Sequence, residues 1–497
     1  MPHAIVVGAG LGGLAAAIRL GARGYRVTVL DRLAVAGGRA TVFRQDGFTF
    51  DAGPTIITAP FVLEELWRFA GRNFHDDVKL RALDPFYVIR FDDGSTFTCR
   101  SDPKAMRDEV ARISPADVQG YEAFMHESEA IYKVGFEQLG HVPFSSVGSM
   151  AAIVPDLLKL KAWKSVFSHV AGHVRHPKLR MALSFHPLFV GGNPFRATSV
   201  YSMIAYLERQ FGVHCAMGGT GAIVQAMVKL IQSQGGEVHC NADVAEITRT
   251  GKRVTGVRLK SGEVLAADIV VSNACVAHTY NALIAGGAKQ RWTKNKLAKS
   301  RHSMSLFVWY FGTNKKFSAV PHHTIIMSKR YKELIEDIFE NKILAADMSL
   351  YLHRPTATDP SLAPAGCDSF YVLSPVPNQD SKIDWAATAE SYRKRIVKRL
   401  DETMMPGFEQ HIVTQRLMTP DDFEHALLSY KGAAFGLEPV LTQSAWFRPH
   451  NKSEEFENLF LVGAGTHPGA GVPGVISTAR VLDQVVPQAE AFARADR

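Results

Sequence analysis

Three glycines near the N-terminus have the spacing of a turn that binds a dinucleotide. Gly8, Gly10 and Gly13 follow the apolar stretch 4–7, and Asp31 ends a second apolar stretch about 20 residues further on. A glycine turn of this form between a strand and a helix, followed by an acid, is the fingerprint of a β-α-β dinucleotide site. The N–H groups at the start of the helix would bind the pyrophosphate, and the carboxylate would accept hydrogen bonds from a ribose. A glycine turn without a ligand is the alternative.

Each glycine has its own physical role in such a turn. Gly8 allows the tight connection from strand to helix, Gly10 lets a pyrophosphate approach the backbone, and Gly13 lets the helix pack closely on the strand. The flanking residues support this turn between a strand and a helix, because 4–7 and 25–31 read as strands and 14–24 reads as a helix of small residues. The first thirty residues therefore predict a complete β-α-β unit.

A second glycine-rich stretch, near the C-terminus, has no charged residue. Residues 459–479 contain Pro468, Pro473 and five glycines, which would repeatedly break a helix embedded in lipid. We read 459–462 as a buried parallel strand and the next residues as a turn into a helix that starts near Gly474. The uncharged run 269–288 reads as a strand, a turn and a helix. We expect neither stretch to span a membrane.

Composition indicates a globular protein. The chain has 497 residues, 46% hydrophobic and 21% charged, which suggests roughly two to three domains. Its formal net charge of +8 permits attraction to anionic surfaces, but no nucleic-acid-binding motif occurs, so we expect no nucleic-acid partner. The five cysteines lie far apart without a C-x-x-C pair, which predicts neither a disulfide framework nor a metal site and fits a cytoplasmic protein.

Patterns typical of a nucleotide-binding domain return in the middle of the chain. Residues 220–234 have apolar positions at helical spacing after a glycine-rich start, and 235–274 read as several short strands. We therefore expect an α/β fold in which a discontinuous Rossmann-like domain carries an inserted α+β domain. The first domain would comprise 1–80, 215–290 and 455–497, and the insert would comprise 81–214 and 291–454.

Seven segments spread over the chain form a set that points to one family. They are "VVGAGLGGLAAAIRL", "GGRA", "FTFDAGPT", "LFVGGNPFRATSVYSMIAYLE" with its "NPF", "GGTGAIVQAM", "EPVLTQSAWFRPHN" and "LFLVGAGTHPGAGVPGVISTA". Together they resemble the bacterial phytoene desaturases, within the carotenoid and retinoid oxidoreductase family. The resemblance covers essentially the whole chain. The first and last segments are shared with amine oxidases and other flavoproteins, whereas the middle ones are typical of a much narrower group of proteins.

The resemblance implies a flavoprotein of the two-dinucleotide-fold type, with FAD as its cofactor. Gly8, Gly10 and Gly13 would lie on the FAD pyrophosphate, and Asp31 on the adenosine ribose. Related flavoproteins usually have Glu at the position of Asp31, and either acid can accept a hydrogen bond from a ribose.

Further FAD contacts follow from the same resemblance. Gly38 and Arg39 would lie near the phosphates, with the arginine as counter-charge. The backbone of Val244 would meet the adenine, an ordinary buried strand valine being the alternative. The glycine turn near the C-terminus would complete the site, with its helix N-terminus facing the flavin. The remaining expected contacts are Thr55, Gly465, Gly474 and Val475.

The resemblance also implies the reaction, a dehydrogenation that extends the conjugation of the forty-carbon polyene phytoene. Lycopene is the expected product, and neurosporene or another acyclic carotenoid is the alternative. FAD would accept the hydride, and the terminal electron acceptor, a quinone or oxygen, stays open. The protein would have to exclude water, so we expect an apolar tunnel. Its candidate wall segments are 183–195, 305–312 and 444–447, each of which could equally be ordinary core.

No catalytic residue can be named from the sequence. Spacing alone assembles no Ser-His-Asp triad, metal site or carboxylate pair. A structural role is the more common one for polar residues within family-like segments, and here these are His186, Arg196, Glu438, Arg448 and His467.

A substrate dissolved in lipid has to be collected from a membrane. Residues 151–174 place six apolar side chains at largely helical spacing, with Lys159, Lys161 and Lys164 elsewhere on the surface. Such a basic amphipathic helix can lie in a bilayer interface, and a solvated helix packed on the core is the alternative. We expect a peripheral protein on the cytoplasmic side of a membrane.

Two other classes of function remain open. A flavin amine oxidase would share the first and last segments, although the sequence gives no clear sign of an aromatic cage. A carotenoid or lipid carrier that merely keeps a nucleotide-binding fold would bind flavin that no substrate reduces.

Overall fold

The N-terminal β-α-β unit forms where the glycine spacing predicts it. The computed structural model describes residues 1–284 and 291–493. Strand β1 (His3–Val7) leads through the glycine turn into α1 (Leu11–Ala22), and β2 (Arg26–Leu30) returns parallel to β1.

Three distant stretches of the chain build one parallel sheet. Its order is β19-β13-β1-β2-β9, and each neighbouring pair is parallel. The strands that join the first unit are β9 (Glu237–His239), β13 (Ile269–Ser272) and β19 (Leu459–Leu461). The predicted buried parallel strand at 459–462 is thereby confirmed, as is the α/β class. The domain boundaries stay a prediction, and the one at 290 lies outside the described residues.

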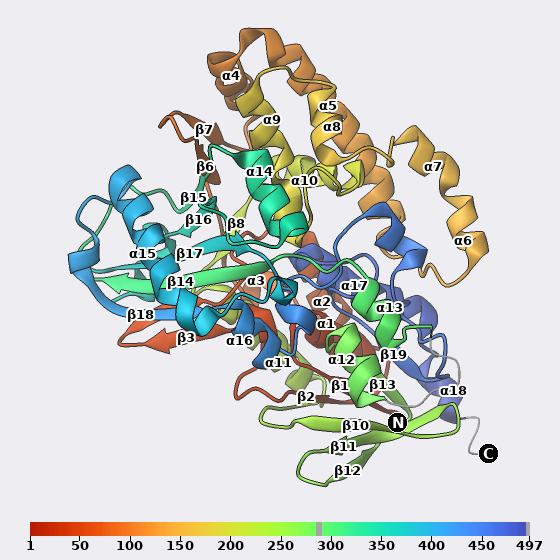
Figure 1. Ribbon diagram of the computed structural model, residues 1–497. Helices are drawn as coiled ribbons and strands as arrows, with labels where there is room; N and C mark the ends of the chain where they lie inside the picture. The colour runs from red at the N-terminus through yellow and green to blue at the C-terminus, as the bar shows by residue number, and fades with distance from the viewer. Residues whose placement is uncertain (285–290, 494–497) are drawn as a thin grey trace.

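Both faces of the parallel sheet are covered, as such a sheet requires. Ala4 and Val6 share a core with α1, α11 (Thr220–Ser233) and α17 (Val472–Val485). Ile5 and Val7 point to the other face and share a second core with an antiparallel sheet (Figure 1). That sheet consists of β10 (Val244–Thr250), β11 (Arg253–Leu259) and β12 (Val264–Ala266).

A larger, mixed sheet lies beside the parallel one. Its order is β18-β14-β17-β16-β15-β6-β7, with β15 and β6 parallel and the other pairs antiparallel. Its strands are β6 (Tyr87–Arg90), β7 (Thr96–Cys99), β14 (Ser305–Thr313), β15 (His323–Ile326), β16 (Leu350–His353), β17 (Asp368–Val376) and β18 (Ile412–Met418).

Strand β14 separates two surfaces of this mixed sheet. Leu306 and Val308 face the cavity described below, whereas Phe307 and Trp309 belong to a separate core with α15 (Trp385–Thr403). Successive strand side chains point to opposite faces, so an uninterrupted apolar run can serve both surfaces.

A group of helices stands over the two sheets, at the top of Figure 1. They are α4 (Pro103–Ile113), α5 (Val118–Tyr132), α9 (Pro177–Ser184) and α10 (Met203–Phe211). The fold also contains three smaller elements. They are α2 (Phe61–Phe69), the hairpin of β3 (Val42–Gln45) and β4 (Phe48–Asp51), and the antiparallel pair β5 (Leu80–Ala82) and β8 (His214–Ala216).

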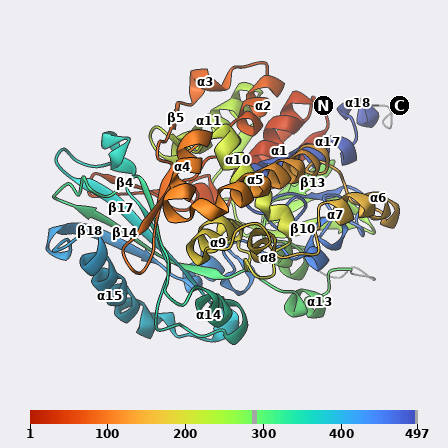
Figure 2. The same ribbon diagram turned by 90° about the horizontal axis from the view of Figure 1, so that it is seen from above.

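The single amphipathic helix predicted over 151–174 is wrong. The segment forms α6 (Val147–Ala152), α7 (Val154–Lys159) and α8 (Val166–Ala171). Pro155 lies in the first turn of α7 and cannot continue α6, and Lys161 adopts a left-handed backbone with φ of 54°. α6 and α7 project from one end of the molecule in both views (Figures 1 and 2).

The described residues of the two uncharged runs form short strands, turns and helices. α17 begins at Val472, two residues before the predicted start near Gly474, because Pro473 is tolerated in a first helical turn. The run 269–288 forms β13, the short α12 (Val276–His278) and a π-helical turn at Thr279–Leu283, and its last residues lie outside the described part. None of the helices described is both long and apolar enough to cross a bilayer.

Candidate functional site

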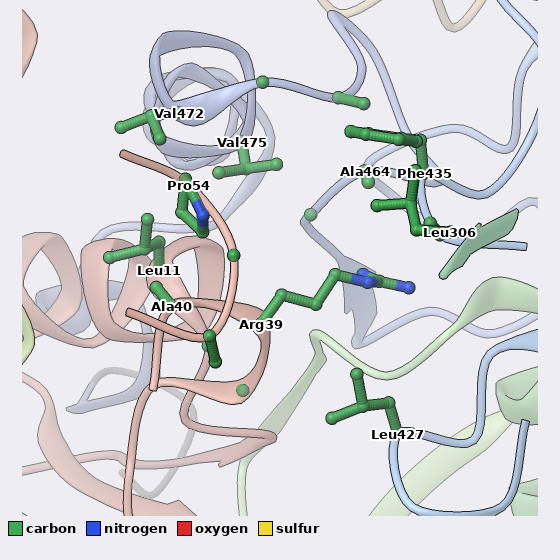
Figure 3. A pocket seen from close by; sticks show the side chains of 18 of the residues that line it. Leu11, Arg39, Ala40, Pro54, Leu306, Leu427, Phe435, Ala464, Val472 and Val475 are labelled. Carbon is green, nitrogen blue, oxygen red and sulfur yellow. The ribbon is translucent and has the colours of Figure 1, made fainter. Parts of the chain in front are cut away.

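One cavity of about 720 Å³ runs from the glycine turn to the mixed sheet. Figure 3 shows part of it, with Leu11 and Val475 on one side and Leu306 and Phe435 on another. We call the part beside the parallel sheet the nucleotide half, lined by Gly8, Gly10, Gly12, Asp31, Gly38, Arg39, Asp243, Val244, Asn273, Gly474 and Val475. The apolar half is lined mainly by Phe185, Leu188, Phe189, Ile204, Leu207, Leu306, Val308, Ile325, Met327, Leu373 and Phe435.

The glycine turn is braced by a residue that sequence reasoning missed. A Cβ added at Gly10 would lie 2.9 Å from Nδ2 of Asn273, and one added at Gly12 would lie 2.8 Å from its Oδ1. Asn273 Nδ2 also donates to the Gly8 carbonyl at 3.3 Å. Its position directly after the buried strand β13 was the available signal, because ligands of parallel sheets bind at the carboxyl ends of strands.

Two helices present unsatisfied N–H groups to the cavity. The residues before them, Gly10 for α1 and Gly471 for α17, provide no side-chain cap. Both helix starts line the cavity. The first N–H groups of a helix have no partner within it and carry a positive partial charge. The nucleotide half is therefore suited to bind an anionic ligand.

Arg39 adds a full positive charge that the protein itself does not neutralise. Its Nη2 donates to Ser429 Oγ at 2.6 Å, and its buried Nε has no partner. Among the described residues, Arg39 forms no ion pair with a carboxylate. Burial lowers the pKa of the guanidinium, which is the expected response of a cation without a counter-charge. The side chain points across the cavity towards Leu427 and Leu306 (Figure 3).

Asp31 both lines the cavity and holds the turn in place. One carboxylate oxygen accepts from the Ala9 N–H at 2.7 Å and the other from the Leu33 N–H at 2.8 Å. Burial is the main influence on its pKa, which is raised. Each oxygen keeps a lone pair for a further donor, so a ribose contact is compatible with this bonding. Asp243, which the sequence did not single out, lines the same region.

The other predicted cofactor residues divide into two groups. Gly38, Thr55, Val244, Gly474 and Val475 line the cavity. Gly13 and Gly465 do not. A Cβ at Gly13 would lie 2.0 Å from the Gly8 carbonyl oxygen, and one at Gly465 would lie 2.5 Å from Val276 Cγ2, so both glycines allow close packing behind the site.

Two of the three predicted wall segments line the apolar half. Phe185, Leu188, Phe189 and Val190 come from 183–195, and Leu306 and Val308 come from 305–312. The segment 444–447 is not part of the lining. It forms a single turn at Ala445–Phe447 whose phenylalanine is exposed.

Comparison with known proteins identifies the family. The sequence pattern of the family described as flavin containing amine oxidoreductase matches residues 11–481. The chain belongs to this flavin-containing amine oxidoreductase family. Within it, the chain groups with the bacterial phytoene desaturases. It is 52% identical to phytoene desaturase (neurosporene-forming) of Cereibacter sphaeroides, over 98% of this chain and 95% of that protein. It is 47% identical to phytoene desaturase (lycopene-forming) of Pantoea ananas, over 97% of this chain and 98% of that protein.

Solved structures share the fold at low identity. A putrescine oxidase mutant superposes with a TM-score of 0.66 at 13% identity, covering 99% of both chains. An oxidoreductase from Methanosarcina mazei gives 0.63 at 17% identity, covering 97% of this chain and 100% of that one. The two-sheet architecture is thus that of flavin amine oxidases.

The nucleotide half fits the flavin that this family contains. The uncompensated charge of Arg39, the uncapped starts of α1 and α17, and a glycine turn with no room for a Cβ all suit a dinucleotide pyrophosphate. The roles of individual residues towards such a cofactor stay predictions.

The polar residues of the family-like segments have structural partners. His186 Nε2 lies 3.2 Å from Glu208 Oε2, and Tyr87 Oη donates to the same carboxylate at 2.7 Å. Arg448 is buried and donates to backbone carbonyls, among them that of Ala464 at 2.8 Å.

Arg196 and His467 also have structural partners. Arg196 pairs with Glu438 at 3.0 Å. The ring of His467 bonds the Leu139 carbonyl at 2.8 Å, and burial lowers its pKa to about 4. These contacts favour the structural role expected from the sequence.

Proposed function

We propose that this protein is an FAD-dependent phytoene desaturase. The observation that carries the proposal is the single cavity, in which a cradle suited to a flavin dinucleotide opens directly into an apolar half. The names of relatives at about half identity, which act on phytoene, support the substrate. The wall is mostly leucine, valine and phenylalanine, which suits a polyene better than a cationic amine, and its carboxylate Glu208 already accepts from Tyr87 and lies 3.2 Å from His186.

The chain's own residues would hold the cofactor and keep water away. Arg39 and the start of α1 would bind the pyrophosphate of FAD, and Asp31 the adenosine ribose. When bound, the flavin supplies the hydride acceptor for oxidation of a CH–CH pair. The side chains of the apolar half would align a polyene beside it and exclude water from the reacting carbons.

We further propose that α7 and the turn after it contact the membrane that stores the substrate. Val154, Leu158 and Trp163 are 44%, 58% and 59% exposed there. Lys159 and Lys164 flank them and would face anionic lipid headgroups. The peripheral position on the cytoplasmic side, and a quinone or oxygen as terminal electron acceptor, are parts of the proposal that rest on the sequence alone.

The membrane contact can be tested by flotation with phosphatidylglycerol-containing vesicles. The double variant Leu158→Ser, Trp163→Ala should bind such vesicles at least ~10-fold more weakly, because apolar burial in the interface is lost. Val413→Ser, at a valine that is 53% exposed on β18, is the control and should bind normally. Equal binding of all three proteins would reject α7 as the contact.

The reaction is tested by expressing the chain in bacteria that accumulate phytoene and analysing the pigments by chromatography. Conversion to neurosporene or lycopene supports the proposal and also decides the number of steps. Peroxide release from soluble amines without phytoene conversion would indicate an amine oxidase. Flavin that binds but is reduced by no substrate would indicate a carrier.

A further inference from the structure

A chain of polar side chains begins at the wall of the apolar half and leads away from it. Tyr351, on β16, lines the cavity. Its hydroxyl lies 2.5 Å from Nδ1 of His323 and 2.7 Å from Oγ1 of Thr55. Tyr371 donates its proton to the Gly53 carbonyl at 2.9 Å, so it does not donate to Thr55 or to Tyr351. Tyr351 can therefore donate to His323 while it accepts from Thr55.

Two more histidines continue this chain behind the wall. His323 and His353 face each other on β15 and β16, and their rings stack with centroids 5.0 Å apart. His353 Nε2 lies 3.2 Å from His322 Nε2, and Nδ1 of His322 lies 2.6 Å from Thr358 Oγ1. One nitrogen of each ring lies within 4.8 Å of one nitrogen of each of the other two. One bridging water can span such a separation, since it forms two hydrogen bonds of about 2.8 Å.

The three imidazoles are buried, and burial favours their neutral form. None is more than 7% exposed. Burial lowers the pKa of His322 to about 3, and lowers the pKa of His323 and His353 well below the ordinary value. A neutral imidazole has one acceptor and one donor nitrogen, so it can take a proton on one side and release another on the opposite side. Nε2 of His323 and Nδ1 of His353 have no protein partner among the described residues and are available for this.

The chain ends in a small polar void that is lined by buried residues. The void measures about 10 Å³, which is room for about one water, and its lining includes His322, His353, Asp51 and Asp359. Asp359 accepts from the N–H and hydroxyl of Ser361, which is exposed to solvent. Asp359 thus links the void to a side chain that is in contact with solvent.

The proposed reaction requires such an exit. Each desaturation breaks two C–H bonds, and a flavin held by Arg39 and the start of α1 would supply the hydride acceptor for one hydrogen. The other leaves as a proton, inside a cavity whose walls are largely apolar. A carbon next to one that has lost hydride gives up its proton readily, so a histidine with a lowered pKa is a sufficient base.

We propose that Tyr351, His323, His353 and His322 form the route by which the substrate proton leaves the cavity. The C–H bond breaks, and its electron pair becomes the new double bond. The proton goes to Tyr351 Oη as the tyrosine's own proton moves to His323 Nδ1. The charge then passes through His353 and His322 to the water and carboxylates of the void. Tyr351 is the catalytic residue, and the histidines act through it. This inference rests on the proposed function.

The same three histidines could be taken for a metal site, but their surroundings disfavour one. The Arg354 guanidinium lies close enough to His322 to lower its pKa further, and it would repel a resident dication twice as strongly as the single charge of a proton in transit. Among the described residues, no carboxylate oxygen joins this group of three ring nitrogens. Metal content therefore becomes an outcome of the test.

The test compares Tyr351→Phe and His323→Asn with the wild type, as holoenzymes on phytoene in vesicles. Asparagine can still accept from Tyr351 but cannot be protonated. Both variants should lose about 100-fold in kcat, the usual contribution of proton transfer, with KM, FAD affinity and melting temperature unchanged. Tyr392→Phe is the matched control, because it removes a buried hydroxyl, bonded to Ser374 at 2.7 Å, from the separate core behind the sheet. It should keep full activity.

A second measurement does not depend on turnover. In protein labelled with ¹⁵N-histidine, Tyr351→Phe should shift the ring-nitrogen signals of His323, and Tyr392→Phe should not. Unchanged signals would show that the Tyr351 to His323 hydrogen bond is absent and would overturn the route.

Each remaining result has a definite meaning. If the wild type leaves phytoene unchanged, the proposed function fails, whatever the variants do. If the wild type is active and the variants match it in kcat, the proton route is wrong. One equivalent of metal per chain in tag-free protein would also overturn it, because the ring nitrogens would then be ligands. If Tyr351→Phe no longer binds FAD, the kcat of His323→Asn decides whether the proton route is right.

Discussion

The two halves of the cavity are built on opposite principles. In the nucleotide half the backbone forms the surface: Gly10 and Gly12 leave no room for a Cβ, and two helix starts without side-chain caps line the cavity. In the apolar half the side chains form the surface, as alternate residues of β14 show. A backbone surface is specified by a few fixed positions, whereas a side-chain surface tolerates many substitutions of similar volume. Substitutions in the nucleotide half should therefore have larger effects than substitutions in the apolar half. They should weaken cofactor binding and folding more than they weaken substrate binding.

The largest effect is expected behind the backbone surface. Gly13→Ala would place a Cβ 2.0 Å from the Gly8 carbonyl oxygen, so helix α1 would have to move off the sheet. We expect a loss of about 3 kcal/mol in the free energy of unfolding and weaker FAD binding, measured by urea denaturation and flavin titration. Gly148→Ala is the control, because the nearest atom to its added Cβ is 3.7 Å away. Equal stability of the two variants would contradict the packing role of Gly13.

Arg39→Ala should separate cofactor binding from folding. Loss of a charge-assisted contact should weaken FAD binding by about 2 kcal/mol, or roughly 30-fold. The FAD-free protein should not be destabilised, because the variant removes a buried cation without a carboxylate partner. Arg44→Ala, at an exposed position on β3, is the control. A variant that melts earlier without FAD yet binds it normally would assign Arg39 to the fold instead.

Asp51, which lines the polar void behind the wall, should make the free energy of unfolding depend on pH, with an effect of intermediate size. Burial raises the pKa of Asp51 to about 6, above the value near 4 of an unfolded aspartate. The folded state then binds the proton more tightly, so this stabilisation is complete below about pH 4 and is lost as pH rises through 6. Asp51→Asn should remove that decline and be about 1 to 2 kcal/mol more stable than wild type at pH 8. Parallel stability profiles of the two proteins would contradict the raised pKa.

The smallest effect is expected on the side-chain surface. Val308→Thr would place a hydroxyl in the apolar half and should lower kcat/KM for phytoene about 5-fold, without changing FAD affinity. Val372→Thr, in the core on the far side of the sheet, should cost similar stability, about 1 kcal/mol, with normal kcat/KM. If both variants lose kcat/KM equally, the distinction between the two faces of the sheet does not hold.

Much of the nucleotide half was predictable because its signals are local. The spacing of Gly8, Gly10 and Gly13 predicted the turn, and the adjacent apolar stretches predicted the β-α-β unit that forms. Local spacing did not show that Asn273 braces the turn, or that Gly465 packs behind the site instead of lining it. Both depend on which strands become neighbours in the sheet.

Regions without such signals were predicted less well. Helical spacing over 151–174 suggested one helix, but Pro155 and the left-handed backbone at Lys161 divide it into three. The polar chain from Tyr351 to His322 was not predicted at all, since its members come from separate segments that meet only in the mixed sheet.

The sequence by itself determined the dinucleotide turn, the α/β class and the family resemblance, because glycine spacing and strand patterning act over a few residues. Only the tertiary structure decided that three distant strands complete the sheet, that alternate residues of β14 line a cavity continuous with the glycine turn, and that three histidines stand behind its wall. The physical reason is that strand pairing and burial are long-range, and a side chain's position in the sequence does not record which surface it will meet.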